Sequence, residues 1–278
     1  MTTVARGPAI ETDEKRPRRK RRKGLLLPIW SWLVILWLSA PIIVMIIFGF
    51  NNTTGKFNIR WQGFTLRWYR ELFTIPDLTQ ALENSLTIAV IVTILATALG
   101  TLMGMALGRY RFRGGGTTNL LMFANIAAPE VVLGASLLSL FLTIGVPRGY
   151  WTIVIAQVMF SIAYVAVTVR ARMAGTDPSL EEAARDLGAG PWTTFWRVTL
   201  PTIMPGVLSG ALLTFALSID DYIITSFNAG KTVTFPLWVY GASRTGVPPQ
   251  VNVMGTLIFM FGVLLAVSGA ISSRRKKA

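Results

Sequence analysis

The sequence contains no cysteine and no histidine. Without these residues the chain cannot form a disulfide, a Cys/His zinc site, a thiol nucleophile or a histidine general base. Charged residues are also scarce, at 14% of 278 residues, whereas hydrophobic residues make up 52%. The absences exclude much of the common catalytic repertoire, and the composition as a whole favours a membrane protein over a soluble enzyme.

What charge there is lies mainly in a basic run near the N-terminus. Every residue from Lys15 to Lys23 except Pro17 is basic, and the formal net charge of the chain is +14. Basic residues that border an apolar segment orient a membrane protein more often than they bind nucleic acid, so we expect no nucleic-acid partner. We interpret residues 1–24 as a disordered cytoplasmic tail and residues 274–278 as a second, short basic tail.

Six apolar segments each approach the ~20 residues that a bilayer-spanning helix needs. The predicted spans cover approximately residues 25–50, 84–108, 118–143, 151–172, 202–225 and 252–273. The first is too long for the apolar part of a cleavable signal peptide, so we interpret it as a retained signal anchor. The sequence therefore predicts an all-α integral membrane protein with six transmembrane helices in one domain, residues 25–273.

The distribution of lysine and arginine predicts the orientation of these spans. Basic residues gather in the two tails, in the loop that contains Arg109 and Arg113, and in the loop between Arg170 and Arg197. The alternate connecting segments contain fewer. By the positive-inside rule, both termini and both basic loops are cytoplasmic, and an even number of spans agrees with that assignment.

Small residues predict where the helices approach one another. Gly100, Gly104 and Gly108 form two overlapping G-x-x-x-G repeats, and Gly206 and Gly210 form another. Such spacing lets helix backbones pack closely in a membrane. We interpret the repeats as packing faces of a helix bundle.

The cytoplasmic loop 176–201 contains an ordered polar stretch, SLEEAARDLGAGPWTTFWRVTLP. Asp177 and Pro178 predict a helix start, because the carboxylate can cap free N–H groups and proline is tolerated at the first helical position. Gly188 predicts the helix end. A narrow apolar face is formed at i, i+3, i+4 and i+7 by Leu180, Ala183, Ala184 and Leu187. A short exposed helix of this kind fits a groove in a soluble partner, and the alternative is a helix lying on the inner membrane surface.

This stretch resembles the EAA loop of the permease subunits of bacterial ABC importers. The shared pattern is Glu-Ala-Ala, three residues, glycine, nine residues, an aliphatic residue, one residue and Leu-Pro; Val198 stands where isoleucine is usual. The resemblance implies a type I importer permease fold in the bacterial plasma (inner) membrane, with coupling helices that dock on an ATPase subunit. It assigns the coupling role to Glu182, Ala183, Ala184, Gly188, Leu200 and Pro201.

The chain itself lacks a recognisable nucleotide site. The tripeptide Gly230–Thr232 ends like a Walker A loop, but Thr225 stands where the first glycine is required. We therefore expect no catalytic residue, cofactor or metal in this chain, and we expect ATP and Mg²⁺ to be bound by a partner ATPase.

Three acidic residues lie within or at the edge of the predicted spans: Glu130 in the third, and Asp220 and Asp221 toward the outer end of the fifth. Acids inside a membrane are costly and usually face a cavity, a partner or a pathway. A straight third span places Glu130 near the membrane midplane. The three acids suit a cationic substrate, which could also contact the aromatic faces of Trp238 and Tyr240.

Structural roles for the acids remain open alternatives. Either aspartate could cap a broken helix or pair with Lys231 or Arg244 in the following loop. Glu130 could be protonated, or hydrogen-bonded at a kink that Pro129 introduces. Intramembrane acids have such uses as well as contacts with substrate.

The segment 217–257 resembles the second of the two homologous permease subunits of spermidine/putrescine importers. Paired aspartates, "SF" followed by glycine, a proline and "GVPPQVN" are the shared features, and the resemblance extends over essentially the whole chain after the basic tail. It implies a polyamine substrate, a homologous second permease, an ATPase dimer and an extracytoplasmic polyamine-binding protein. The alternatives are a permease for another small solute such as iron, sulfate or molybdate, a stand-alone channel or secondary transporter, and a membrane-embedded enzyme.

Overall fold

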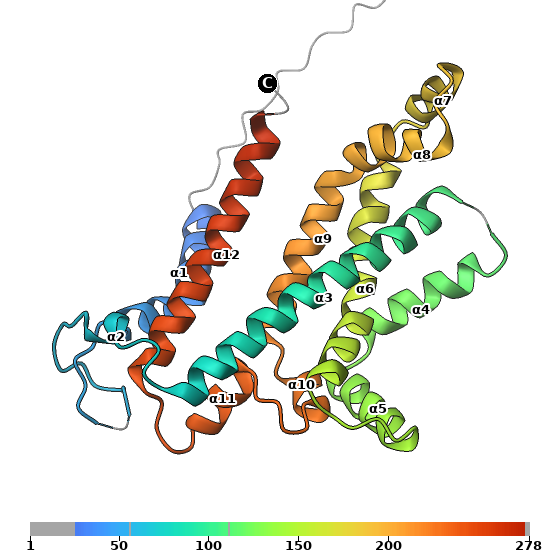
Figure 1. The fold of residues 1–278 in the computed structure, drawn as a ribbon. Helices are drawn as coiled ribbons and strands as arrows, with labels where there is room; N and C mark the ends of the chain where they lie inside the picture. The colour runs from blue at the N-terminus through green and yellow to red at the C-terminus, as the bar shows by residue number, and fades with distance from the viewer. Residues whose placement is uncertain (1–25, 56, 111, 276–278) are drawn as a thin grey trace, which may run out of the picture. The chain divides into compact units, whose positions relative to one another are not determined.

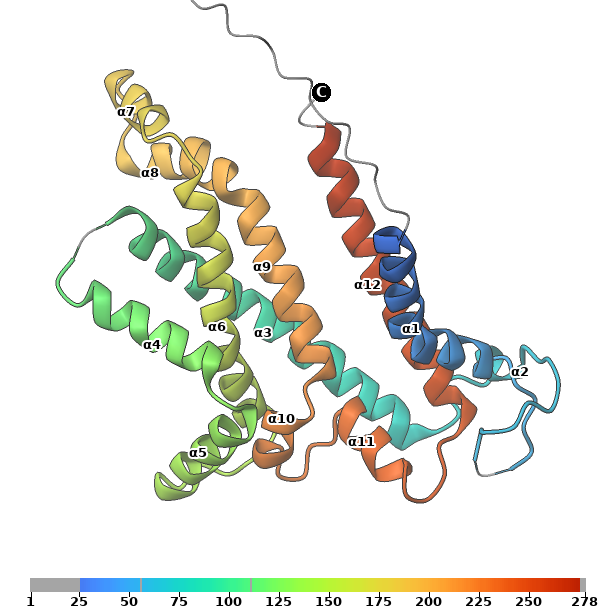
Figure 2. The same ribbon diagram turned by 180° about the vertical axis from the view of Figure 1, so that it is seen from behind.

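A computed structural model describes residues 26–55, 57–110 and 112–275 and is drawn from two sides in Figures 1 and 2. The predicted tail at residues 1–24 and the last residues of the second tail, 276–278, lie outside the described residues. The chain divides into two units, residues 1–43 and 44–278. The described residues form helices and turns, with a single isolated β-bridge between Asn51 and Phe64 and no β-strand.

The first apolar segment forms helix α1 (Leu26–Phe48), which starts in the first unit and ends in the second. Its residues from Pro28 to Phe48 are long and apolar enough to cross a membrane. Pro41 lies inside the helix, as is common in apolar membrane helices but rare in soluble ones.

Three long helices form the packed centre of the second unit: α3 (Pro76–Arg109), α6 (Tyr150–Ala174) and α9 (Leu200–Asp220). All three contact one another. Helix α6 is the most buried of the candidate membrane spans, and its buried residues include the fully enclosed Val165 and Val169. A helix that is apolar on every side and enclosed by others is the expected centre of a membrane bundle.

Glycines allow these three helices to approach closely, as the G-x-x-x-G repeats predicted. A Cβ atom added to Gly104 of α3 would lie 2.7 Å from the carbonyl oxygen of Ala166 in α6. One added to Gly210 of α9 would lie 2.7 Å from Oγ1 of Thr168, also in α6. Both distances are shorter than van der Waals contact, so only glycine fits at these crossings.

The third apolar segment is not the single straight helix that we expected. It forms α4 (Gly115–Ala127) and α5 (Glu130–Thr143), whose axes are bent by 109°. The physical reason is Pro129, which has no N–H group and disfavours a helical conformation at the preceding residue. Ala128 is accordingly extended, with φ −69° and ψ 137°. Glu130 therefore begins a second helix, and the expectation that it lies midway along a straight span is wrong.

The second unit also contains α2 (Arg67–Arg70), α10 (Ile223–Asn228), α11 (Phe235–Ala242) and α12 (Pro249–Arg275), besides the short helices between α6 and α9. The predicted fifth span, 202–225, ends earlier than expected because α9 stops at Asp220. Four described helices are long and apolar enough to cross a membrane, or five if α4 and α5 form one span, and Pro249–Leu265 is a shorter apolar helix. The count of six spans stays a prediction.

Helix α3 is tied to the segment between α10 and α11 near its first turns. Nδ2 of Asn84 donates a hydrogen bond to the carbonyl oxygen of Val233 (2.8 Å). The backbone N–H of Phe235 donates to Oγ of Ser85 (2.9 Å). The opposite end of α3 lies 24 residues further along the chain from Ser85, at Arg109.

Candidate functional site

Two parts of the second unit carry the residues that the sequence singles out. The first is the loop between α6 and α9, which folds into α7 (Ser179–Asp186), α8 (Pro191–Thr194) and a π-helical turn, η1 (Phe195–Thr199). In Figure 1, α7 and α8 lie at the same side of the second unit as the C-terminal end of α12. This common side agrees with a loop and a C-terminus in one compartment.

The start of α7 is capped as the sequence predicted. The backbone N–H of Ser179 donates a hydrogen bond to Oδ1 of Asp177 (3.0 Å). This hydrogen bond holds the pKa of the Asp177 carboxyl below its ordinary value, because it stabilises the ionised form. Pro178 then precedes the first helical residue, where its missing N–H costs nothing.

The end of α7 explains the glycine of the motif. Gly188 has φ +84°, in the left-handed region that other residues rarely adopt. Its N–H donates to the carbonyl oxygen of Arg185 (2.8 Å), and the N–H of Ala189 donates to that of Ala184 (3.0 Å). These two bonds form a Schellman motif, which closes the helix and satisfies its last carbonyl groups. The spacing from Glu182 to Gly188 thus has a local structural cause.

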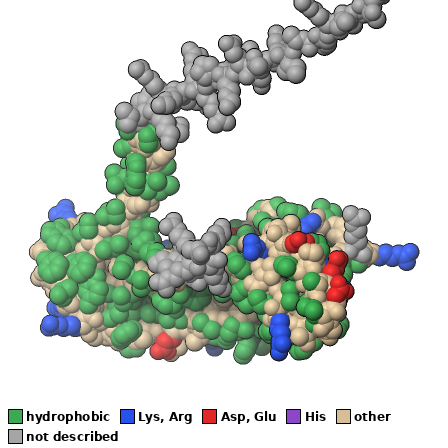
Figure 3. Space-filling view, turned by 90° about the horizontal axis from the view of Figure 1, so that it is seen from above, with side chains coloured by type: hydrophobic (Ala, Val, Ile, Leu, Met, Phe, Trp, Pro, Cys, Tyr) green, Lys and Arg blue, Asp and Glu red, His purple; other side chains and the backbone are tan. Residues whose placement is uncertain are grey.

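The loop presents large apolar side chains to the surroundings. Leu187 is 89% exposed and Trp192 is 73% exposed, although both are large and apolar. Acidic and basic residues lie beside them in α7, and the space-filling view from above shows these charges close together (Figure 3). Clustered exposed apolar groups with a charged rim are typical of a protein–protein interaction site.

The six predicted coupling residues are distributed along this loop. Glu182 and Ala183 are exposed, whereas Ala184, in the same helix, is half-buried. Gly188 is exposed at the end of the helix. The last two residues of the motif, Leu200 and Pro201, begin α9, so the motif runs from the exposed helix through α8 and η1 into the packed bundle.

Glu181 attaches α7 to the rest of the unit, a role that its position in the first turn did not predict. Its Oε2 lies 2.7 Å from Nη2 of Arg109, at the end of α3, and the two side chains are only 15% and 25% exposed. Oγ1 of Thr199, in η1, donates to the other carboxylate oxygen (3.0 Å). Arg109 is 72 residues away in the chain, which is why sequence spacing did not indicate the pair.

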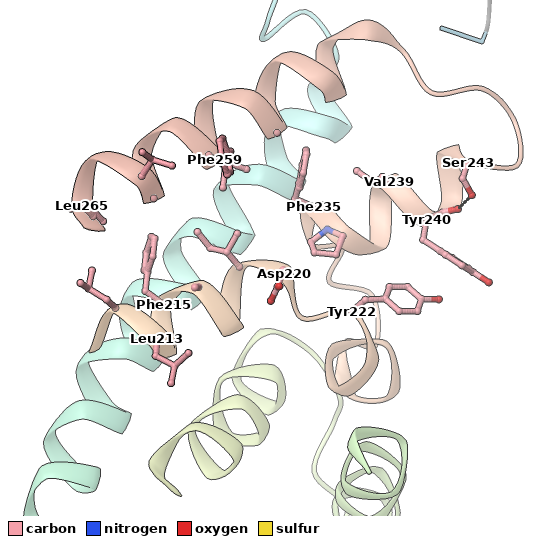
Figure 4. Close-up of a pocket in the computed structure, with 18 residues that line it drawn as sticks. Leu213, Phe215, Asp220, Tyr222, Phe235, Val239, Tyr240, Ser243, Phe259 and Leu265 are labelled. Atoms are coloured by element: carbon pink, nitrogen blue, oxygen red, sulfur yellow. Dashed lines mark hydrogen bonds between the residues drawn. The ribbon is translucent and has the colours of Figure 1, made fainter. Parts of the chain in front are cut away.

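The second part is a cavity of about 1000 Å³ lined by residues of α9, α11 and α12 and of the connection after α9. Most of its lining is aliphatic or aromatic, and Asp220 is the acidic residue in it. Figure 4 shows Asp220 between apolar side chains such as Phe215 and Phe259 and the hydroxyl-bearing Tyr222 and Tyr240. One carboxylate in an otherwise apolar cavity can select a cation that also carries apolar groups.

Two tyrosines line one side of this cavity, and an arginine outside the lining contacts one of them. The rings of Tyr222 and Tyr240 lie 4.6 Å apart between centroids. Nη2 of Arg244 donates to the hydroxyl oxygen of Tyr240 (3.0 Å). Tyr240 was predicted from its aromatic face, whereas Tyr222 was missed, although its position directly after the paired aspartates could have indicated it.

The ion pair that was an open alternative for the aspartates is not formed. Within the described residues, neither Lys231 nor Arg244 forms a salt bridge with Asp220 or Asp221. Asp221 instead caps α10, which was the other alternative. Its carboxylate accepts hydrogen bonds from the backbone N–H groups of Ile224 (3.2 Å) and Thr225 (2.9 Å).

The remaining predicted pathway residues lie apart from the cavity lining. Glu130 is exposed at the first turn of α5. Trp238 is half-buried against the cluster that contains Leu72 and Leu78, and it lines a different cavity of about 980 Å³. The structure thus brings Asp220 and Tyr240 together in one cavity and places Trp238 in another.

The described residues include no group of three histidine, cysteine, aspartate or glutamate side chains arranged to hold a metal ion.

Residues 96–277 match the family described as "Binding-protein-dependent transport system inner membrane component". Over 259 residues the chain is 37% identical to the spermidine/putrescine transport system permease protein PotC of Escherichia coli (strain K12), covering 93% of this chain and 96% of that one. It is 39% identical over 261 residues to the putrescine transport system permease protein PotI of the same strain, covering 89% and 92%.

Solved structures share the fold at lower sequence identity. One is a chain from a bacterial ABC transporter involved in the import of the acidic polysaccharide alginate, with a TM-score of 0.65, 18% identity, and coverage of 93% of this chain and 98% of that one. Another belongs to the MetNI methionine ABC transporter in an inward-facing conformation, with a TM-score of 0.59, 17% identity, and coverage of 71% and 95%.

Proposed function

Because the chain belongs to the family of binding-protein-dependent transport system inner membrane components, we propose that it is the permease subunit of an ATP-driven polyamine importer in the bacterial plasma membrane. The observation that carries this proposal is the exposed helix α7, closed by the Schellman motif at Gly188 and joined to α9 through α8 and η1. A helix with an exposed apolar and charged surface, held at the end of a bundle, is suited to docking in a groove of an ATPase.

The coupling mechanism follows from how α7 is attached. A dimer of ATPase subunits that binds ATP and Mg²⁺ closes and moves the docked helices. Each α7 transmits this movement through its ion pair with Arg109 and through the continuous chain into α9. The permease pair then exchanges inward- and outward-facing states, because ATP-bound and ATP-free partners bind the two states with different affinity.

The polyamine substrate is supported by two independent observations. Two relatives that the chain matches over most of their length are named for spermidine and putrescine transport. The cavity that contains Asp220 is largely apolar and has one carboxylate in its lining. A polyamine alternates ammonium groups with methylene groups, so its charge can pair with the carboxylate while its carbon chain contacts the apolar walls.

The assembly that we propose has the permease paired with a homologous second permease, so that the translocation pathway lies between two subunits. An extracytoplasmic binding protein delivers the polyamine to the outer face. The subunit has six spans with both termini in the cytoplasm, and the side of the second unit that carries α7 and the C-terminal end of α12 is the cytoplasmic one (Figure 1).

Substrate-stimulated ATP hydrolysis by the purified complex in lipid tests this proposal. Putrescine and spermidine are presented by the binding protein, and sulfate, iron and amino acids serve as controls. We expect stimulation by polyamine alone. Stimulation only by another solute would keep the importer and reject polyamine, and the absence of any partner ATPase would leave a channel, a secondary transporter or a membrane enzyme.

A further inference from the structure

A buried glutamine connects three helices at the break between α9 and α10. Gln157 of α6 is only 3% exposed. Its Nε2 donates to Oδ2 of Asp221 (3.0 Å) and to Oγ1 of Thr225 (2.9 Å). Its Oε1 accepts a hydrogen bond from Oγ of Ser218, in the last turn of α9 (2.5 Å).

In this network, both the NH2 group and the carbonyl oxygen of the Gln157 side chain have hydrogen-bond partners. Both amide hydrogens have an acceptor, and the carbonyl oxygen has a donor. Leaving a buried amide without partners is costly, so the side chains that contact it are held in one arrangement. Gln157 therefore fixes Ser218, before the break, relative to Asp221 and Thr225, which follow it.

The two neighbouring aspartates are left in different environments. The carboxylate of Asp221 accepts four hydrogen bonds, from the side chains of Gln157 and Thr225 and from two backbone N–H groups of α10. In the described part of the chain, the carboxylate of Asp220 makes no hydrogen bond or ion pair with another side chain, and it faces the cavity. A substrate ammonium group can therefore reach Asp220 without displacing a donor on another side chain.

We infer that Gln157 is a positioning residue for substrate recognition. It holds Asp221 as the cap of α10 and thereby orients Asp220 as the one of the two aspartates that receives the substrate amine. This inference rests on the proposed import of polyamines, and it assigns distinct roles to two adjacent residues of the same type.

The direct test is a double-mutant cycle on the apparent KM of substrate-stimulated ATP hydrolysis. Gln157→Met keeps the length of the side chain and removes its hydrogen-bonding groups. We expect this change alone to raise the apparent KM for spermidine about fivefold while the rate at saturating substrate stays within about twofold. In an Asp220→Asn background, the same change should alter the apparent KM by less than about twofold, because Gln157 acts through Asp220.

Thr152→Val provides a matched control. Thr152 lies on the same helix, is 1% exposed, and also reaches the α10 segment through a hydrogen bond from its Oγ1 to the carbonyl oxygen of Asn228 (2.8 Å). None of its side-chain hydrogen bonds involves Asp220, Asp221 or Gln157. We expect its loss to leave the apparent KM within about twofold of the unmodified protein, since a general weakening of α10 packing does not reorient Asp220.

A labelling experiment measures the orientation without transport. The natural chain has no cysteine, so Asp220→Cys introduces a single thiol. A positively charged methanethiosulfonate reagent should modify this thiol, and Gln157→Met should lower the labelling rate about threefold or more, because the position no longer faces the cavity.

The outcomes separate this inference from the proposed function. If neither polyamine stimulates the unmodified complex, the proposed function fails and the role of Gln157 in amine recognition fails with it. If the unmodified complex responds but the effects of Gln157→Met and Asp220→Asn are additive, or labelling is unchanged, then only the inference about Gln157 is wrong.

Discussion

The two ends of α9 differ in how far they are exposed and in which residues their hydrogen bonds join. At its start, Leu200 and Pro201 continue a loop whose large apolar side chains face outward and whose helix α7 is closed by hydrogen bonds between residues close in the chain, with the Glu181–Arg109 ion pair as a tie to the bundle. At its end, Ser218 and Asp221 belong to a buried network whose partner on α6 is more than 60 residues away. The helix before the start of α9 is closed mainly by local hydrogen bonds and is largely exposed, whereas the end of α9 is enclosed by tertiary contacts.

Because its two ends differ, α9 can connect a site for a protein partner with a site for a ligand. Another protein can bind the exposed end without unfolding it, because α7 is stabilised by its own caps at Asp177 and Gly188. The buried end keeps its geometry while a ligand enters, because the hydrogen bonds of Asp221 are made within the chain. Changes at either end should therefore have separable effects.

The largest expected effect comes from breaking the exposed end alone. Gly188→Arg forces an L-residue to φ +84°, which costs about 1–2 kcal/mol, and so disrupts the end of α7. We expect co-purification with the ATPase to be abolished while the protein still inserts in the membrane. Gly190→Arg is the matched control, because Gly190 has φ −69° and open space around it. Full ATPase assembly by the Gly188 variant would contradict a docking role for α7.

Breaking the buried end should give the next largest effect. Asp220→Asn removes the charge from the cavity, and we expect polyamine uptake in vesicles to fall about tenfold or more with ATPase assembly unchanged. Asp221→Asn should also lower uptake with assembly intact, but it should lower the thermal stability of the subunit as well, because α10 loses part of its cap. Normal transport by both variants would show that these acids are not in the substrate pathway.

Breaking the ion pair that joins the exposed loop to the bundle should have a smaller effect. Glu181→Gln removes the ion pair with Arg109, and we expect substrate-stimulated ATP hydrolysis to fall about threefold while the ATPase still co-purifies. The exchange variant Arg109→Glu/Glu181→Arg restores opposite charges and should recover part of the activity. An unchanged stimulation factor in Glu181→Gln would mean that the ion pair is not needed for coupling.

The smallest effect concerns the first turn of α7. Asp177→Ala removes the carboxylate whose pKa is lowered by the N–H of Ser179. Because a lowered pKa favours the folded state only above the unfolded value, the contribution is complete at neutral pH and is lost as the pH falls through the folded pKa. We expect the unmodified chain to melt at a slightly higher temperature than the variant at pH 7, and the difference to vanish in acid. A difference that does not shrink as the pH falls would rule out a titrating cap.

The difference between the ends of α9 also decides what the sequence could predict. The helix start at Asp177 and its end at Gly188 were predicted because capping and left-handed glycines are properties of a few consecutive residues. The distinct environments of Asp220 and Asp221 could not be predicted, because two adjacent residues of the same type give the same pattern. Only the position of Gln157 in space distinguishes them.

The bend at Pro129 shows a second limit of reading a sequence by its hydrophobicity. Residues 118–143 are mostly apolar, and hydrophobicity alone does not show where such a segment changes direction. The proline was recognised as a kink, but its effect, a bend of 109°, depends on how α4 and α5 pack against other helices. The depth of Glu130 therefore could not be obtained from the rise per residue.

Helix α3 adds a mechanical property to this arrangement. One end is bonded to α7 through Arg109 and Glu181, and the other, roughly 36 Å away at ~1.5 Å per residue, is bonded through Ser85 to the chain that enters α11. An α-helix resists compression along its axis, so α3 acts as a strut between the two segments. A displacement of α7 must either shift this strut, and with it the wall of the cavity that contains Tyr240, or break the bonds at its ends.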